Sequence, residues 1–132
     1  MNKILIVEDD KFAQQFYKML LQRKGYETIF SEEPSKIFDI LSNNDISLII
    51  MDVNLTNTRI ENKEIDGFVL ASLIKMKNFD HIPIILVSAF SLNENTLHKF
   101  KACKADDYIQ KPITDFNLFL EKINELISKK KR

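Results

Sequence analysis

Polar side chains follow three apolar runs of this 132-residue sequence, each at the point where the run ends. The three junctions are Ile4-Leu5-Ile6-Val7 before Glu8-Asp9-Asp10, Leu48-Ile49-Ile50-Met51 before Asp52, and Ile84-Ile85-Leu86-Val87 before Ser88. Carboxylates held close together take up protons or bind a cation, and all-oxygen ligation favours a hard ion such as Mg²⁺. Lys111, at the end of a later predicted strand, could neutralise a phosphoryl group, to which the Ser88 hydroxyl could donate a hydrogen bond.

Asp52 is the carboxylate of this set that is best suited to phosphoryl transfer. The continuous apolar run before it is typical of a strand buried on both faces. Because an ionised carboxylate is costly to bury without partners, we expect Asp52 where this strand leaves the sheet. A carboxylate in that position can act as a nucleophile and form an acyl phosphate. Positioning and charge neutralisation supply most of what such a transfer needs.

Each of these features taken alone also has an ordinary structural explanation. Acidic residues after a strand are usually solvated loop residues, a serine there is more often a helix cap, and a Lys-Pro pair is usually a turn. The order and joint spacing of the features therefore support the functional interpretation more strongly than any single residue.

Apolar periodicity predicts five strands that alternate with five helices. Strands are expected over residues 3–7, 27–30, 46–53, 84–88 and 107–110. Helices are expected over 11–24, from 34 to a break at 43–45, over 68–77, from 91 to about 102, and from a cap at Thr114 through Ile127.

The inward faces of two of these helices are predicted from spacing. In the first helix the stripe comprises Phe12, Phe16, Met19 and Arg23, widened by Ala13, Leu20 and Leu21. In the fourth helix Leu97 and Phe100 are expected to face inward, after a capping box formed by Ser91 and Glu94.

This alternation predicts an α/β fold with one parallel sheet covered by helices on both faces. In such open sheets, ligands bind at the carboxyl ends of the strands, near the switch point in strand order. This rule places six residues on one rim: Glu8, Asp9, Asp10, Asp52, Ser88 and Lys111.

Length and composition indicate one globular domain. The chain has 45% hydrophobic and 29% charged residues, and its 19 basic and 19 acidic residues give a formal net charge of +0. We therefore expect no direct nucleic-acid binding, and the basic end at 129–132 is interpreted as a solvated helix end. The single cysteine, Cys103, excludes an intramolecular disulfide. No signal peptide and no run long enough for membrane insertion is evident, so a cytoplasmic protein is expected.

Glu8-Asp9, Asp52, Ser88-Ala89 and Lys111-Pro112 resemble, in their order and at these strand ends, the receiver domain of two-component response regulators. The resemblance extends over about residues 2–128. It implies a single receiver domain over 1–132, with a basic tail at 129–132. The implied fold is a flavodoxin-like, doubly wound three-layer sandwich, with a five-stranded parallel sheet in the order 2-1-3-4-5 between five helices.

The resemblance also implies a role for individual residues. Asp52 would be the phosphoacceptor, and Mg²⁺ would be held by Glu8, Asp9, Asp52 and the backbone carbonyl of Asn54. Ser88, Ala89 and Lys111 would contact the phosphoryl group, Tyr108 would be an aromatic switch, and the bond before Pro112 would be cis. The implied partners are a sensor histidine kinase or histidine phosphotransfer protein and a downstream protein target, so the chain would be a signalling phosphoacceptor rather than an enzyme.

Two departures from the family pattern stand out. Thr56 occupies a position where proline is common, and Asp66-Gly67 arrives seven residues late, so that residues 56–65 form an expanded loop. This loop is either a tolerated insertion or a functional element such as a lid or a partner contact. Lys104 stands where the family often has glycine, which implies a strained residue or a different turn.

Two alternative functions remain open on the sequence. The first is a receiver-like protein-interaction module that works without phosphorylation. The second is a flavodoxin-like cofactor binder, which would need a phosphate-binding loop rich in glycine, serine or threonine after the first strand. Glu8-Asp9-Asp10 in that position would repel a phosphate unless a metal intervened.

Overall fold

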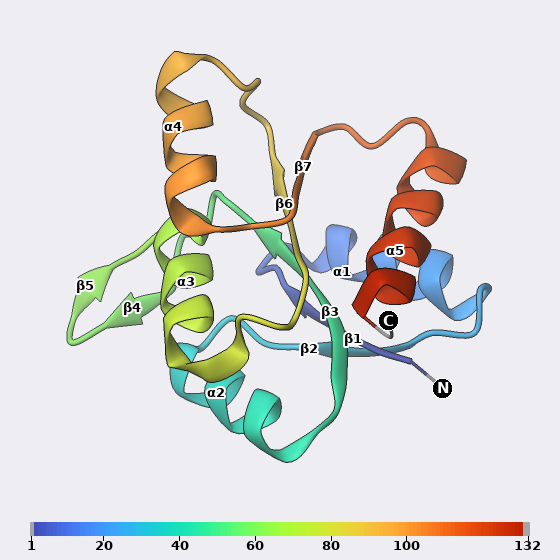
Figure 1. Ribbon diagram of the computed structural model, residues 1–132, viewed down its shortest axis with the longest axis horizontal. Helices are drawn as coiled ribbons and strands as arrows, with labels where there is room; N and C mark the ends of the chain where they lie inside the picture. The colour runs from blue at the N-terminus through green and yellow to red at the C-terminus, as the bar shows by residue number, and fades with distance from the viewer. Residues whose placement is uncertain (1, 131–132) are drawn as a thin grey trace.

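The computed structural model describes residues 2–130, with side chains through residue 129, so residues 131–132 of the predicted basic tail lie outside it. Five parallel strands form one sheet in the order β2-β1-β3-β6-β7, with helices on both faces (Figure 1). The strands of this sheet are β1 (Lys3–Val7), β2 (Glu27–Phe30), β3 (Ile46–Asp52), β6 (Ile84–Ser88) and β7 (Asp107–Gln110). The helices are α1 (Lys11–Gln22), α2 (Pro34–Asn43), α3 (Gly67–Ile74), α4 (Glu94–Cys103) and α5 (Phe116–Lys130).

The predicted fold is confirmed, because the strands of the sheet, numbered along the chain, have the order 2-1-3-4-5. Each strand sends alternate side chains to opposite faces. One core cluster joins Leu5, Ile49 and Leu86 to the helices α2, α3 and α4, and a second joins Ile50 and Val87 to α1 and α5. Figure 1 shows these two groups of helices on opposite sides of the sheet. No helix within the described range is both long and apolar enough to span a membrane.

The predicted inward face of α1 is partly wrong. Phe12 and Met19 are 87% and 61% exposed, whereas Tyr17 and Leu21 are buried against the sheet. Two apolar stripes with helical spacing lie side by side on this helix, and contact with the sheet and α5 buries the second of them. The helix also ends at Gln22, before the expected Lys24.

The caps of the last two helices also differ from the prediction. Asn93, not Ser91, caps α4: its side chain accepts a hydrogen bond from Thr96 N at 3.0 Å, and the Thr96 hydroxyl accepts one from Asn93 N at 2.8 Å. Asp115, not Thr114, accepts from the backbone N–H of Leu118 at the start of α5. Several residues in each segment can cap a helix, and the path of the preceding loop selects one of them.

The packing of α4 is mixed. Phe100 packs against the core and, edge to face, against Tyr108, as predicted for an inward position. Leu97 remains 37% exposed, so the prediction that it faces inward is wrong. Lys104 follows the helix with φ 67°, in the left-handed region. Of the two predicted possibilities, a strained residue or a different turn, the structure has the strained residue. A non-glycine residue in this conformation costs about 1–2 kcal/mol.

Helix α3 is shorter than the predicted 68–77. Regular α-helix ends at Ile74 and continues as a π-helical segment, η1 (Lys75–Phe79), which contains Asn78 at φ 71°. The side chain of Lys75 donates hydrogen bonds to the carbonyl of Ile82 and to the Asp106 carboxylate. These bonds connect the end of this helix to the segments just before β6 and β7.

The expanded segment 56–65 forms a small hairpin rather than an irregular loop. Strand β4 (Arg59–Ile60) pairs in antiparallel fashion with β5 (Lys63–Glu64). The two residues of its turn, Glu61 and Asn62, have φ values of 53° and 66°, the left-handed pair that suits a two-residue hairpin. In Figure 1 the hairpin projects from the body of the molecule beyond α2 and α3.

Candidate functional site

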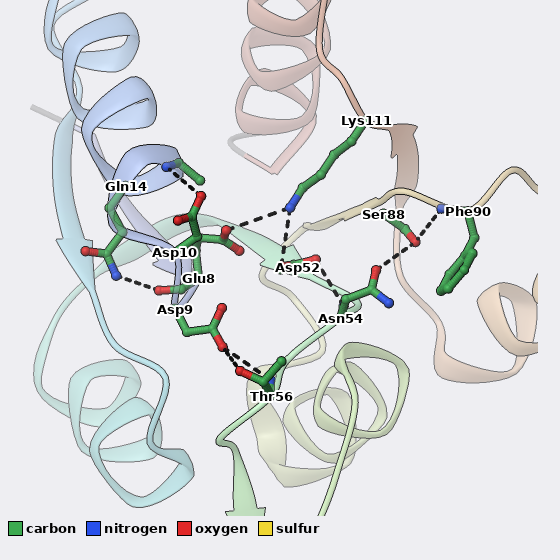
Figure 2. Close-up of polar contacts among 11 residues, drawn as sticks. Glu8, Asp9, Asp10, Gln14, Asp52, Asn54, Thr56, Ser88, Phe90 and Lys111 are labelled. Atoms are coloured by element: carbon green, nitrogen blue, oxygen red, sulfur yellow. Dashed lines mark hydrogen bonds and ion pairs between the residues drawn. The ribbon is translucent and has the colours of Figure 1, made fainter.

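The parallel sheet brings the predicted residues together at the carboxyl ends of its strands. Val7 pairs with Met51, Asp52 pairs with Val87, and Ser88 pairs with Gln110. The residues at and just after these pairs therefore share one edge. Figure 2 shows Glu8, Asp9, Asp52, Ser88 and Lys111 converging there.

Asp52 lies at the centre of this edge and is 6% exposed. Its Oδ2 atom is 3.3 Å from Nζ of Lys111, and its Oδ1 atom accepts a hydrogen bond from the backbone N–H of Asn54 at 3.0 Å. The backbone behind it is covered by Gly67, where an added Cβ would lie 2.7 Å from Cα of Val53. Gly67, which follows the expanded segment in the sequence, is thus needed for close packing of α3 on the end of β3.

Glu8 is the most deeply buried acid of the site, at 2% exposure. Its Oε1 atom is 3.7 Å from Nζ of Lys111, and its buried Oε2 atom has no hydrogen-bond partner among the described residues. Burial, reinforced by the neighbouring carboxylate of Asp52, raises the pKa of Glu8 to about 8. At neutral pH this carboxyl group therefore keeps a proton unless a cation takes its place.

Asp9 completes an acidic cluster with Glu8 and Asp52. One carboxylate oxygen from each of the three residues lies within 4.8 Å of the others. The Oδ2 atom of Asp9 accepts hydrogen bonds from the backbone N–H of Thr56, at 3.2 Å, and from the Thr56 hydroxyl. The all-oxygen donor set and the unpartnered oxygen of Glu8 both fit a hard divalent cation.

Ser88 is fully buried on the other side of Asp52. Its hydroxyl donates to Oδ1 of Asn54 at 3.3 Å and accepts from the backbone N–H of Phe90 at 3.1 Å. Ala89 is exposed, and its backbone N–H is the only donor it offers. Ser88 is the last residue of β6 and Ala89 follows it, and the contact of both with a group on Asp52, which the family resemblance implies, stays a prediction.

Tyr108 and Pro112 connect the site to the last strand and helix. The Lys111–Pro112 peptide bond is cis, as expected. The Tyr108 hydroxyl donates to the backbone carbonyl of Phe90 at 2.6 Å, in the loop that follows Ser88. The aromatic side chain is therefore attached to the segment that leaves the site, although its role as a switch stays a prediction.

The structure separates one predicted rim residue from the site and adds two others. The Asp10 carboxylate caps α1 by accepting from the backbone N–H of Ala13 at 3.2 Å. Gln14 donates to the backbone carbonyl of Glu8 at 2.6 Å and steadies the loop that carries the acids. Thr56 was visible in the sequence only as a departure from proline, and its contact with Asp9 depends on the path of the inserted segment.

The arrangement has the parts that accepting a phosphoryl group requires. A nearly buried carboxylate could attack, an ammonium group and a cation site could neutralise negative charge, and a hydroxyl lies at the next strand end. Glu8, Asp9 and Asp10 occupy the segment after β1, where their carboxylates would repel a flavin phosphate.

Comparisons with known proteins agree with this geometry. The model of the family described as the response regulator receiver domain matches residues 4–124. The transcriptional regulatory protein RprY of Bacteroides fragilis is 34% identical over 112 residues, which cover 85% of this chain but only 44% of RprY. The polar-differentiation response regulator DivK of Brucella ovis is 28% identical over 114 residues, which cover 86% of each protein.

A similar structure is the response regulator protein TrrA from Thermotoga maritima, which was solved in complex with Mg(2+)-BeF. It has a TM-score of 0.76 and 28% identity to this chain, and the match covers 96% of this chain and 99% of TrrA.

Proposed function

This chain belongs to the response regulator receiver domain family of two-component signalling, and we propose that it accepts a phosphoryl group on Asp52. The observation that carries the proposal is the environment of the Asp52 carboxylate. It is 6% exposed, lies 3.3 Å from the ammonium group of Lys111, and shares an edge with Glu8 and Asp9. Residues 1–132 would act together as one receiver domain.

The donor would be a phosphohistidine of a sensor histidine kinase or a histidine phosphotransfer protein. An oxygen of Asp52 attacks phosphorus, and the phosphorus–nitrogen bond of the donor breaks. The nitrogen keeps the bonding electron pair and takes up a proton, while Asp52 becomes an acyl phosphate. Lys111 is close enough to neutralise the transferred oxygens, and its ammonium would then exchange a contact with Asp52 for one with the phosphoryl group.

The acidic cluster would hold Mg²⁺, in agreement with the ion named for TrrA. Glu8, Asp9, Asp52 and the backbone carbonyl of Asn54 would be the residues that bind it. A bound Mg²⁺ would neutralise negative charge on the transferring group. On binding the cation, Glu8 would release its proton, and the negative charge of Asp9 would be balanced.

The signal would arise from competition for the Ser88 hydroxyl. It now donates to Asn54, and a phosphoryl group on Asp52 would offer a charged acceptor in its place, with the N–H of Ala89 as a second donor. Movement of this loop would disturb Phe90, whose carbonyl holds the Tyr108 hydroxyl. The surface formed by β7 and the helices α4 and α5 would then present a different shape to a downstream protein target.

We place this function in the cytoplasm, where a kinase and a protein target could both reach the chain. The chain would act as a signalling acceptor that promotes only its own phosphorylation and dephosphorylation, without binding nucleic acid directly.

Incubation with acetyl phosphate and Mg²⁺, followed by intact-mass measurement, tests the proposal. We expect one phosphoryl adduct on the wild-type protein and none on Asp52→Asn. Asp10→Asn is a matched control, because Asp10 is a neighbouring acid that caps α1 and asparagine keeps that cap. Absence of an adduct on the wild type would overturn the proposal and favour a module that works without phosphorylation.

A further inference from the structure

Thr56 makes two hydrogen bonds to one carboxylate oxygen of the acidic cluster. Its backbone N–H and its hydroxyl both donate to Oδ2 of Asp9. Figure 2 shows that the second oxygen of Asp9 points away from Thr56, toward the side where Glu8 and Asp52 lie. Thr56 therefore fixes the orientation of Asp9 and leaves one of its oxygens facing the cluster.

The same threonine begins the inserted segment 56–65, which is held at its base by further hydrogen bonds. The Thr58 side chain, 1% exposed, donates to the backbone carbonyl of Glu32 at 3.0 Å. The backbone N–H of Ile65 donates to the carbonyl of Thr58 at 3.0 Å and closes the segment on itself. The β4–β5 hairpin is thus built directly onto a residue that holds Asp9.

We propose that Thr56 is a positioning residue that couples cation binding at Glu8, Asp9 and Asp52 to the order of the β4–β5 hairpin. The proposal deepens the proposed function and rests on it, because it takes the acidic cluster to be the cation site. It also gives the inserted segment a role other than a lid, since the hairpin projects away from the body of the molecule (Figure 1).

Two physical arguments support this coupling. Hydrogen bonds to an ionised carboxylate are stronger than neutral ones, and partners that orient a metal ligand raise the affinity for the metal. Coupling between cation binding and the hydrogen bonds of Thr56 is reciprocal. If the cation binds better when Thr56 is bonded to Asp9, then the bound cation must also favour the conformation of the segment in which those bonds form. Proline, common at this position in the family, offers neither the N–H nor the hydroxyl.

The test uses the full-length protein and two measurements. Mg²⁺ affinity is measured by calorimetric titration for the wild type, Thr56→Val, Thr56→Ser and Thr28→Val. Hydrogen exchange of the amides of residues 57–65 is measured by NMR with and without Mg²⁺. Thr56→Ser keeps both hydrogen-bond donors. Thr28→Val makes the same substitution of threonine by valine on the edge strand β2, away from the acidic cluster.

We expect Thr56→Val to raise the Kd for Mg²⁺ by roughly 10-fold, at the lower end of the effect of removing such a partner, because its backbone N–H remains. Thr56→Ser and Thr28→Val should bind Mg²⁺ as the wild type does. Mg²⁺ should slow exchange of the hairpin amides in the wild type and in Thr56→Ser, and should slow it much less in Thr56→Val.

Two results would overturn the coupling while leaving phosphorylation of Asp52 intact. One is an unchanged Kd in Thr56→Val, and the other is hairpin exchange in the wild type that does not respond to Mg²⁺. The second result needs no variant, so it decides the matter even if a substitution disturbs folding. A wild type that binds no Mg²⁺ would overturn both this coupling and the cation site of the proposed function.

Discussion

The Nζ atom of Lys111 lies 3.3 Å from Oδ2 of Asp52, although Asp52 ends β3, Lys111 follows β7, and β6 lies between these two strands in the sheet. The ammonium group thus reaches across a strand end to the carboxylate, and its distance to Oε1 of Glu8 is only 3.7 Å. Its positive charge partly offsets the charge of Asp52 and opposes the rise in the pKa of Glu8.

Removing this ammonium group should slow phosphorylation of Asp52. We expect Lys111→Met to reduce the rate with acetyl phosphate by about 100-fold, the usual effect of losing one group that stabilises developing charge. Lys122→Met is the matched control, because Lys122 is similarly exposed and pairs with Asp107 at 2.9 Å on the edge strand β7. Equal rates for Lys111→Met and the wild type would contradict the role assigned to Lys111.

The titration of Glu8 should make stability depend on pH when no divalent cation is present. Its pKa is about 8 in the folded protein against an ordinary value of 4.5, so the folded state holds a proton that the unfolded chain releases. The stabilisation is complete below about pH 4.5 and is lost as the pH rises toward 8. Chemical unfolding in EDTA should therefore show a free energy of unfolding that falls across this interval.

Glu8→Gln is the comparison that isolates this group, because glutamine cannot titrate. The difference in free energy of unfolding, Glu8→Gln minus wild type, should increase as the pH rises across the same interval, because only the wild type loses stability there. Parallel pH profiles for the two proteins would show that Glu8 does not titrate in this range.

Substitution of Gly67 should harm both stability and phosphorylation. An added Cβ would lie 2.7 Å from Cα of Val53, so the backbone behind Asp52 must shift. We expect Gly67→Ala to lower the free energy of unfolding by about 1–3 kcal/mol and to slow the reaction with acetyl phosphate.

Gly25→Ala separates the two effects. Apart from its two chain neighbours, no described heavy atom would lie within 4 Å of the added Cβ, but the residue has φ 83° and follows the end of α1, whereas Glu8 and Asp9 precede its start. It should lower the free energy of unfolding by about 1–2 kcal/mol through backbone strain and leave phosphorylation unchanged. Normal phosphorylation of Gly67→Ala would contradict the packing argument.

Loss of the Tyr108 hydroxyl should shift the unphosphorylated protein toward its phosphorylated form. Tyr108→Phe removes the 2.6 Å hydrogen bond to the carbonyl of Phe90, and a bond of this kind contributes about 1 kcal/mol. We expect amide chemical shifts of α4, β7 and α5 to move toward those of the phosphorylated wild type. Tyr26→Phe, beyond the end of α1, is the control, and shifts confined to the immediate neighbours of residue 108 would refute the prediction.

The shared edge of the site could be predicted from the sequence pattern, whereas the strand order could be predicted only from the family resemblance. Apolar runs that end in Glu8, Asp52 and Ser88 locate strand ends, and parallel pairing places those ends together. The cis peptide bond before Pro112 could be predicted only from the family resemblance.

Other features depend on tertiary packing and could not be predicted from spacing. Phe12 and Tyr17 belong to neighbouring stripes of one helix, and only the contact with the sheet decides which is buried. The proton on Glu8 follows from the depth of its burial. The contact between Asp9 and Thr56 depends on the route of an inserted segment, which no local pattern specifies.

The hairpin offers a place to attach a spectroscopic probe. Its turn residue Asn62 is exposed, whereas the only native thiol, Cys103, is 3% exposed, donates to the carbonyl of Phe100 at 3.2 Å and has a pKa raised by burial. A thiol introduced by Asn62→Cys could be labelled selectively without removing Cys103. A fluorophore there would lie outside the edge that carries Asp52 and would still report, through Thr56, on what occupies the acidic cluster.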